Sequence, residues 1–119
     1  MMVSAWCGSG HSRWNGGGRP GVFTFNKNTP GAEHPTQKPL PLMAELVRLF
    51  SFQGEVVCDP FSGSGTTGVA AVKLGRKFVG IEQDPKWFDL ACKRLRGALD
   101  SPDMFIEPPK PAKQEALQL

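Results

Sequence analysis

Residues 55–68 read EVVCDPFSGSGTTG, and they carry the strongest indication of the fold class. Its first four residues form a largely apolar run that ends at Asp59, which predicts a short buried strand. A glycine-rich loop follows, and a helical pattern runs from it over about residues 66–74, closed by Gly75. A strand, a tight loop and a helix in this order are the first half of a βαβ unit.

The flanking segments complete this unit. A second apolar run, residues 78–81, ends at Glu82 and predicts a second buried strand. Asp84, a good N-cap residue that a proline follows, predicts a helix over about 85–99. Upstream, apolar residues at helical spacing predict a helix over about 41–52, which a glycine ends. The predicted fold class is therefore α/β, a partial Rossmann-like fold with a parallel sheet and flanking helices.

Two strands leave a parallel sheet incomplete. Parallel sheets normally have both faces covered, and we expect the three helices to cover parts of two faces. At least one strand edge stays unpaired, which exposes its backbone hydrogen-bonding groups. The sequence therefore predicts self-association, a complementary chain or marginal stability.

The composition excludes several classes of protein. The chain has 119 residues, enough for one small domain, and its 14 glycines and 11 prolines indicate much loop. It has no apolar run long enough to span a membrane, and its start lacks the pattern of a secretory signal. A net charge of +3 permits an anionic partner without demanding one.

The cysteines indicate the compartment. Cys7, Cys58 and Cys92 are widely spaced and odd in number, which is typical of a reduced, cytoplasmic protein. Cys7 and His11 have the spacing of half a zinc site, but no second half accompanies them, so we expect no metal.

The chain divides into three segments. Residues 1–33 hold seven of the fourteen glycines and one expected strand, residues 22–25, and form a lead-in. Residues 34–99 carry the strong periodic patterns and are the expected core. Residues 100–119 are rich in proline and form an exit segment and a tail.

Polar groups gather where both predicted strands end. In such a sheet, ligands bind beyond the carboxyl ends of the strands, and these ends carry Asp59 and Glu82. Glu82 lies at the end of the second strand, where a carboxylate can accept two hydrogen bonds from a ribose diol. Gly63 and Gly65 allow the backbone to approach a ligand closely. Hydroxyls and amides at the start of the next helix favour an anion. These groups belong to Ser64, Thr66 and Thr67.

Three interpretations of this pattern remain. The spacing Gly63-x-Gly65-x-x-Gly68 is that of a dinucleotide-binding loop. Asp59 would repel a pyrophosphate, however, whereas it suits the ammonium of S-adenosylmethionine, whose carboxylate and ribose suit the helix start and Glu82. The structural alternative is a plain glycine-rich turn, in which both carboxylates only cap the strand ends.

Two motifs give the chain a family resemblance. HPTQKP at residues 34–39 precedes a helical pattern, and DPFSGSGTT at 59–67 precedes GIE at 80–82. Together they resemble the carboxy-terminal part of DNA amino-methyltransferases, which methylate the exocyclic amine of adenine or cytosine with S-adenosyl-L-methionine. The resemblance covers about residues 34–95. More weakly, residues 13–18 resemble the segment before the first motif in phage and prophage members.

The resemblance implies a cofactor site, double-stranded DNA as substrate, and a role of the restriction-modification type. Residues 36–38 would lie against the methionine end of the cofactor, Asp59 would face its amino group, and Glu82 would hold the ribose hydroxyls. Phe61, for which packing is the alternative role, would line the cleft with two glycines. The cofactor-binding residues that it implies are Thr36, Gln37, Lys38, Asp59, Phe61, Gly63, Ser64, Gly65, Thr66, Thr67 and Glu82.

One motif of the family is missing. The family grips its target base with Asp-, Asn- or Ser-Pro-Pro followed by an aromatic residue, whose ring stacks on the flipped base. This sequence has no tyrosine, and its single Pro-Pro pair lies in residues 107–110, EPPK, with Lys110 in place of the ring. We therefore expect no catalytic residue in the chain and no activity of the chain alone. The alternatives to a cofactor-binding methyltransferase portion are a non-catalytic remnant, a subunit that needs a complementary chain, and a dinucleotide-binding fragment.

Overall fold

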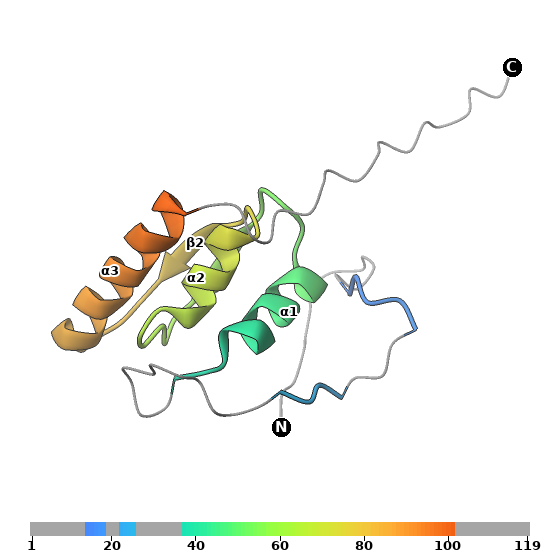
Figure 1. Cartoon of the computed structure of the whole chain (residues 1–119), viewed down its shortest axis with the longest axis horizontal. Coiled ribbons are helices and arrows are strands. Elements are labelled where there is room, and N and C mark those ends of the chain that lie inside the picture. Colours follow the sequence, from blue (N-terminus) through green and yellow to red (C-terminus); the bar gives the residue numbers. More distant parts are fainter. Residues whose placement is uncertain (1–13, 19–21, 26–36, 102–119) are drawn as a thin grey trace, which may run out of the picture.

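The computed structural model describes residues 14–18, 22–25 and 37–101 (Figure 1). In chain order, the helices and strands are α1 (Leu40–Phe50), β1 (Val56–Asp59), α2 (Thr66–Lys73), β2 (Lys77–Gly80) and α3 (Pro85–Asp100). Every helix and strand predicted between residues 41 and 99 is present, with small shifts at its ends. The predicted α/β class is confirmed.

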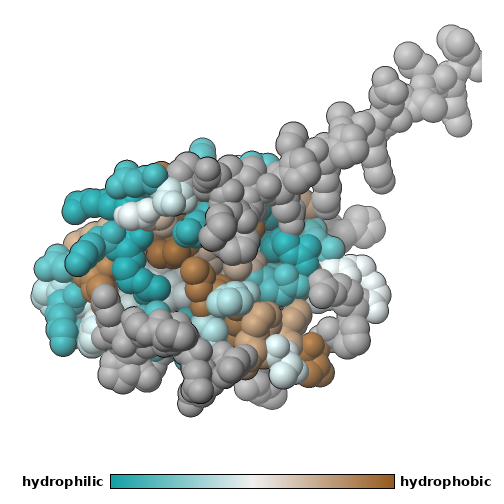
Figure 2. Space-filling view, viewed as in Figure 1, coloured by the Kyte–Doolittle hydropathy of each residue, from teal (hydrophilic) through white to brown (hydrophobic). Residues whose placement is uncertain are grey.

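A two-stranded parallel sheet and a layer of helices make up the fold. β1 and β2 pair so that Val57 lies opposite Phe78, and α2 is the crossover between the strands. α2 packs against both strands, while α1 and α3 pack against either side of α2 (Figure 1). Figure 2 shows the hydrophilic residues that gather over α3, with hydrophobic residues nearer the middle of the view. The helices therefore cover one face of the sheet.

The other face of the sheet is bare in the part of the chain that the structure describes. Val56, Val79 and Ile81 are 59%, 51% and 58% exposed. We expected fully buried strands and helices over parts of two faces, and both expectations are wrong. Side chains alternate between the faces along a strand, and all three helices lie on the same side, so every second strand residue is left exposed.

The core lies between the helix layer and the covered face. Its members are small or medium-sized, and the two strand residues of this face pack against it: Val47, Ala70, Ala71, Leu74, Val57 and Phe78. α2 sits close to β2 because Gly68 has no side chain; a Cβ there would lie 2.5 Å from the ring of Phe78. Leu49 is the largest fully buried side chain. Within the described residues, the core is thus built mostly from small and medium-sized side chains.

Two helix ends follow the local sequence signals. The side chain of Asp84 accepts a hydrogen bond from the amide of Lys86 at 2.9 Å, which is the predicted N-cap of α3. After α2, the amides of Gly75 and Arg76 donate to carbonyl groups of the last turn at 3.0 and 2.8 Å. This pair of bonds is the Schellman motif, and it ends the helix where the glycine predicts.

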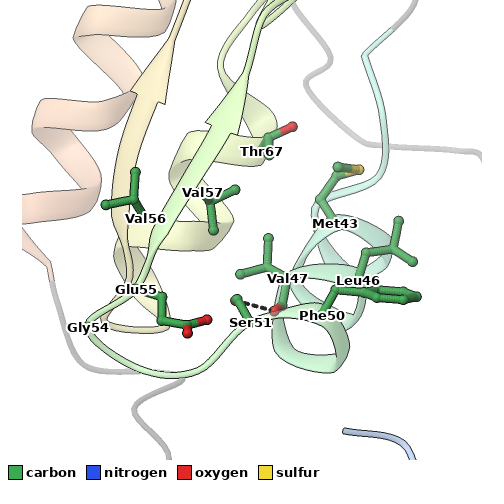
Figure 3. Close-up of a pocket in the computed structure, with 10 residues that line it drawn as sticks. All are labelled: Met43, Leu46, Val47, Phe50, Ser51, Gly54, Glu55, Val56, Val57 and Thr67. Atoms are coloured by element: carbon green, nitrogen blue, oxygen red, sulfur yellow. Dashed lines mark hydrogen bonds between the residues drawn. The ribbon is translucent and has the colours of Figure 1, made fainter. Parts of the chain in front are cut away.

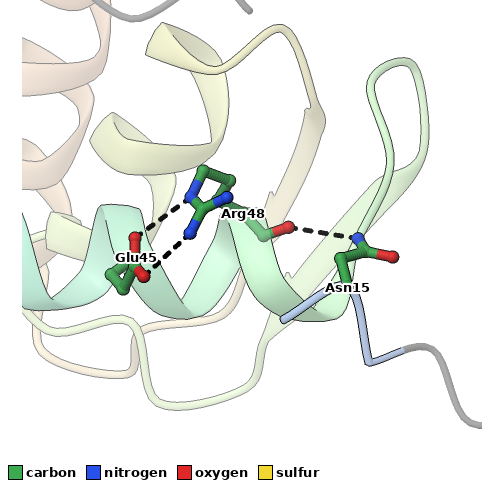
Figure 4. Close-up of polar contacts among 3 residues, drawn as sticks. All are labelled: Asn15, Glu45 and Arg48. Carbon is green, nitrogen blue, oxygen red and sulfur yellow. Dashed lines mark hydrogen bonds and ion pairs between the residues drawn. The ribbon is translucent and has the colours of Figure 1, made fainter. Parts of the chain in front are cut away.

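The end of α1 is decided by a distant segment. α1 ends at Phe50, earlier than the following glycine predicts. The side-chain amide of Asn15 donates to the carbonyl groups of Arg48 and Ser51, each at 3.1 Å. Figure 4 shows the first of these bonds, together with the paired bonds from Arg48 to the carboxylate of Glu45. Asn15 therefore caps a helix that begins 25 positions after it.

Residues 22–25 form no strand, contrary to the prediction. Val22 is 81% exposed, and neither strand of the described sheet pairs with this segment. A strand needs a neighbouring strand that pairs with its backbone groups, so the apolar pattern alone does not make these residues a strand. The Cys7–His11 pair and the Pro-Pro pair of the tail lie outside the described residues.

Candidate functional site

The loop between β1 and α2, residues 60–65, is the centre of the candidate site. The amide of Ser62 donates to the carbonyl oxygen of Ile81 at 3.0 Å, which ties the loop to the end of β2. The amide of Gly65 donates to the carbonyl oxygen of Ser62 at 2.8 Å, so the loop also folds back on itself. It lies beyond the carboxyl ends of both strands, where ligands of parallel sheets bind.

Both strand-end carboxylates hold this loop. Asp59 accepts hydrogen bonds from the hydroxyl of Thr67 at 2.6 Å and from the amide of Phe61 at 3.1 Å. Glu82 accepts from the amide of Gly63 at 2.8 Å and from the amide of the N-cap residue of α3 at 2.9 Å. Each carboxylate oxygen thus has one protein donor, which is the capping role of the structural alternative, and it retains a lone pair for a ligand.

A cavity of about 490 Å³ opens between this loop and the start of α1. We call it the loop cavity. Eight of the eleven residues predicted for the cofactor site line it: Gln37, Lys38, Asp59, Phe61, Gly63, Ser64, Thr66 and Thr67. The two motifs, which lie about 20 positions apart in the sequence, therefore meet at one cavity.

Of the other three predicted residues, Gly65 and Glu82 are not among those that line the loop cavity. Thr36 lies outside the described residues. Gly65 differs from its predicted place: its φ is 75°, and a Cβ there would lie 2.9 Å from the Cβ of Ala91. Gly65 thus permits the close approach of α3, and its role toward a ligand stays a prediction. Glu82 contacts the loop from the side of β2 instead, through its bond to Gly63.

The loop cavity carries polar groups that have no protein partner. Three backbone amides at the start of α2 have no acceptor among the described residues, and the helix dipole makes this end positive: those of Ser64, Thr66 and Thr67. The side-chain oxygen of Gln37 is buried without a donor, again within the described chain. Lys38 adds a positive charge beside them. A ligand with an anionic group would satisfy the amides and Lys38.

Several residues of the site were not predicted. Ser62 lines the loop cavity, and so do Leu42, Met43 and Leu46 of α1. Helical periodicity identifies the α1 residues as apolar, but it does not show whether another element covers them. Arg94 of α3 was missed as well, although its guanidinium contacts the loop 30 positions away. No local motif marks such a contact.

A second and larger cavity, of about 560 Å³, lies along the free edge of β1 (Figure 3). We call it the edge cavity. Within the described sheet, β1 pairs only with β2, and the edge cavity occupies the space between its other edge and α1. Figure 3 shows Val57 on one side and Met43, Val47 and Phe50 on the other. Its walls are mostly apolar, which suits a peptide segment better than a polar small molecule.

Two further observations concern the described residues alone. None of their helices is long and apolar enough to cross a membrane. No three of their His, Cys, Asp or Glu side chains come together as metal ligands would. Cys58 and Cys92 are free thiols, whereas Cys7 and His11 lie outside this part of the chain.

The similarity of this chain to known proteins covers the site and most of the remaining sequence. The family model for the DNA methylases of the N6/N4 type matches residues 6–93. The chain belongs to the DNA methylase family. The match covers both motifs and the segment that contains Asn15, and it confirms the family that the motifs predict.

Two curated relatives of this methylase chain are type II methyltransferases. M.HinfI of Haemophilus influenzae is 43% identical over 83 residues, which are 65% of this chain and 23% of that protein. M2.DpnII of Streptococcus pneumoniae is 46% identical over 75 residues, which are 63% of this chain and 28% of that protein. The chain thus spans about a quarter of the length of these relatives.

Solved structures agree with the fold. The complex of M1.HpyAVI with S-adenosylmethionine matches with a TM-score of 0.58 and 36% identity, over 69% of this chain and 43% of that one. TTHA0409 is a DNA modification methylase of Thermus thermophilus, and its structure was solved with S-adenosyl-L-methionine. It matches with a TM-score of 0.50 and 45% identity, over 58% of this chain and 28% of that one. This methylase chain therefore has part of the Rossmann-like fold of S-adenosylmethionine-dependent methyltransferases.

Proposed function

We propose that the chain is the cofactor-binding portion of an S-adenosylmethionine-dependent DNA methyltransferase. Its reaction would transfer a methyl group to the exocyclic amine of adenine or cytosine in double-stranded DNA. Family membership and two similar proteins solved with S-adenosylmethionine support this proposal. The observation that carries it is the meeting of Asp59, Lys38 and the unpartnered amides of α2 at the loop cavity.

The methionine end of the cofactor has the charges that the loop cavity needs. Its ammonium would bind the remaining lone pairs of Asp59, and Gln37, which lines the same cavity, would lie against this end of the cofactor. Its carboxylate would bind the amides at the start of α2 and the side chain of Lys38. Thr36, next in the chain to Gln37, would complete this end of the site.

The adenosine end would lie toward the tip of the loop and the end of β2. Phe61 is 89% exposed, so its ring packs against nothing in the described chain and is available to the cofactor. Glu82 would use the second lone pair of each carboxylate oxygen for the ribose hydroxyls, while it continues to hold Gly63. The bound cofactor supplies a methyl group on a sulfonium, and these residues would orient it.

We further propose that the chain alone binds the cofactor but does not methylate DNA. The sequence has no tyrosine, and its single Pro-Pro pair is followed by Lys110. A group that grips the target amine and stacks on the flipped base would have to come from another portion of the enzyme. The three widely spaced cysteines support a cytoplasmic location for the complete protein.

The edge cavity is where we place this complementary portion. The free edge of β1 offers backbone groups to a further strand, and the apolar side chains of α1 would cover that strand. A second copy of the chain at the same edge is the alternative occupant. Sedimentation of the chain alone distinguishes them, because only the second copy gives a dimer without any other protein.

Calorimetry and thermal melting with defined ligands test the cofactor assignment. We expect S-adenosylmethionine and S-adenosylhomocysteine to bind and to raise the melting temperature, and NAD to do neither. Asp59→Asn should weaken binding, because it removes the charge that faces the ammonium, whereas Asp100→Asn, at the exposed end of α3, should not. Stabilisation by NAD without stabilisation by S-adenosylmethionine would instead support a dinucleotide-binding fragment.

A methylation assay tests the second part of the proposal. Unmodified DNA and S-adenosylmethionine carrying a labelled methyl group should give no labelled DNA with the chain alone. Incorporation that Asp59→Ala abolishes would contradict this expectation and would indicate a catalytic group within these 119 residues.

A further inference from the structure

A single arginine joins α3 to the candidate site. Nη1 of Arg94 donates to the carbonyl oxygen of Ser64 at 2.6 Å, to the hydroxyl of Ser64 at 2.9 Å and to the hydroxyl of Thr66 at 3.2 Å. Ser64 and Thr66 are 4% and 5% exposed, and both line the loop cavity. Their hydroxyls and their backbone amides therefore have different surroundings, because among the described residues only the hydroxyls have a partner.

We propose that Arg94 is a positioning residue for the anionic end of the ligand in the loop cavity. By holding the hydroxyls of Ser64 and Thr66, it keeps their amides available to an anion. Its positive charge lies beside the same helix end and adds to the potential that favours an anion there. This inference rests on the proposed function, in which that anion is the carboxylate of S-adenosylmethionine.

Packing alone does not require this arginine. α3 already contacts α2 and its loop through Ala91, which lies against Gly65, and through Leu95, which lies against Gly68. Ala91 and Ala98 of α3 are buried. Loss of the guanidinium should therefore leave α3 in place and release the orientation of residues 64–66.

Two ligands separate a positioning role from a structural one. S-adenosylhomocysteine has the amino-acid end, whereas 5′-methylthioadenosine lacks it and shares the adenosine. We would measure the Kd of each ligand by calorimetry or ligand-observed NMR for the wild-type chain, Arg94→Met and Arg94→Lys. Arg96→Met, an exposed arginine two positions along α3, is the matched control. Thermal melts of every variant report its folding.

The expected result is a selective loss. Arg94→Met should raise the Kd of S-adenosylhomocysteine about tenfold or more, because the carboxylate would lose about one hydrogen bond from a backbone amide that is no longer held in place. The Kd of 5′-methylthioadenosine should stay within about twofold of the wild-type value. Arg94→Lys keeps the charge and a donor, so its Kd for S-adenosylhomocysteine should lie between those of Arg94→Met and the wild type. It also provides the same ligand comparison if Arg94→Met does not fold. Arg96→Met should bind both ligands as the wild type does.

Three results would overturn the inference. Equal losses for the two ligands would show a structural role, and unchanged affinity for S-adenosylhomocysteine in folded Arg94→Met would show no role. A wild-type chain that binds neither ligand would contradict the proposed function itself, and the inference would fail with it. The last result differs from the first two because it appears before any variant is compared.

Discussion

The two faces of the small sheet have opposite surroundings, although their side chains are of the same kind. Val57 and Phe78 pack against the core under α2. Their neighbours Val56 and Val79 are 59% and 51% exposed. Apolar residues on both faces are typical of a parallel sheet that is covered on both sides. The composition of the strands therefore suits a sheet in a larger protein than the described residues form. The chain also matches only 23% and 28% of the lengths of two relatives, which agrees with this.

The same comparison explains the two cavities. The loop cavity lies at the strand ends, where the alternation of the covered face continues to Asp59 and Glu82, and both carboxylates are partly buried and hydrogen bonded. The edge cavity lies along the edge of β1 that pairs with no strand of the described sheet, and most of the residues that line it are apolar. The loop cavity differs from it in the charged side chains and the helix start that line it, Lys38, Asp59 and residues 64–67, and these groups suit a charged ligand.

The largest effect should come from truncating one residue on each face. Phe78→Ala should lower the free energy of unfolding by about 2–4 kcal/mol, because it removes a ring from the core under α2. Val79→Ala, on the bare face, should lower it by less than about 1 kcal/mol. Urea unfolding of both variants measures the difference. Equal losses would mean that something covers the bare face in solution.

A smaller effect should come from adding a methyl group on each side of the helix layer. Gly68→Ala places a Cβ 2.5 Å from the ring of Phe78, and we expect a net loss of about 1–2 kcal/mol from this overpacking. Gly97→Ala on α3 meets nothing within 4 Å, so its better helix propensity should stabilise by about 0.5–1 kcal/mol. Opposite signs in one denaturation series are the expected outcome. A stabilised Gly68→Ala would contradict the close packing of α2 on the covered face.

Glu82→Gln tests the end of the covered face. The amide keeps the shape of the side chain but leaves one acceptor oxygen for two backbone amides, so stability should fall by about 1 kcal/mol. If the same carboxylate also holds the ribose, the affinity for S-adenosylhomocysteine should fall about tenfold. Gln83→Ala, next to it and exposed, is the control for both measurements. A loss of stability with unchanged affinity would leave Glu82 with the capping role alone.

The smallest effect on stability, but a clear one on association, should come from the bare face. Val79→Thr combined with Ile81→Thr makes two exposed positions polar and should change the free energy of unfolding by less than about 0.5 kcal/mol. If this face drives self-association, sedimentation should shift toward the monomer. Leu99→Thr, at an exposed apolar position on α3, should leave association unchanged. Equal shifts in both proteins would mean that the association is not specific to the bare face.

Much of the fold and of the candidate site follows from local patterns. Each of the three helices and two strands has its own signal, and eight of the eleven predicted site residues line one cavity. The misses have one physical cause. Gly65 was expected at a ligand, but a Cβ there would meet Ala91 of α3, and residues 22–25 were expected to be a strand but pair with neither strand of the described sheet. Local pattern identifies a suitable segment, and a neighbour distant in the sequence decides its role.

The order of the elements and most of their ends follow from the sequence alone, because the contacts involved join residues only a few positions apart. The N-cap bond that the amide of Lys86 donates to the side chain of Asp84 is an example. Only the tertiary structure decided which face of the sheet is covered, that Asn15 caps α1 from 33 positions away, and that Arg94 holds the loop from 30 positions away. An apolar or polar pattern shows that a side chain needs a partner, but the partner is specified by how the helices pack, and packing joins residues whose spacing carries no periodic signal.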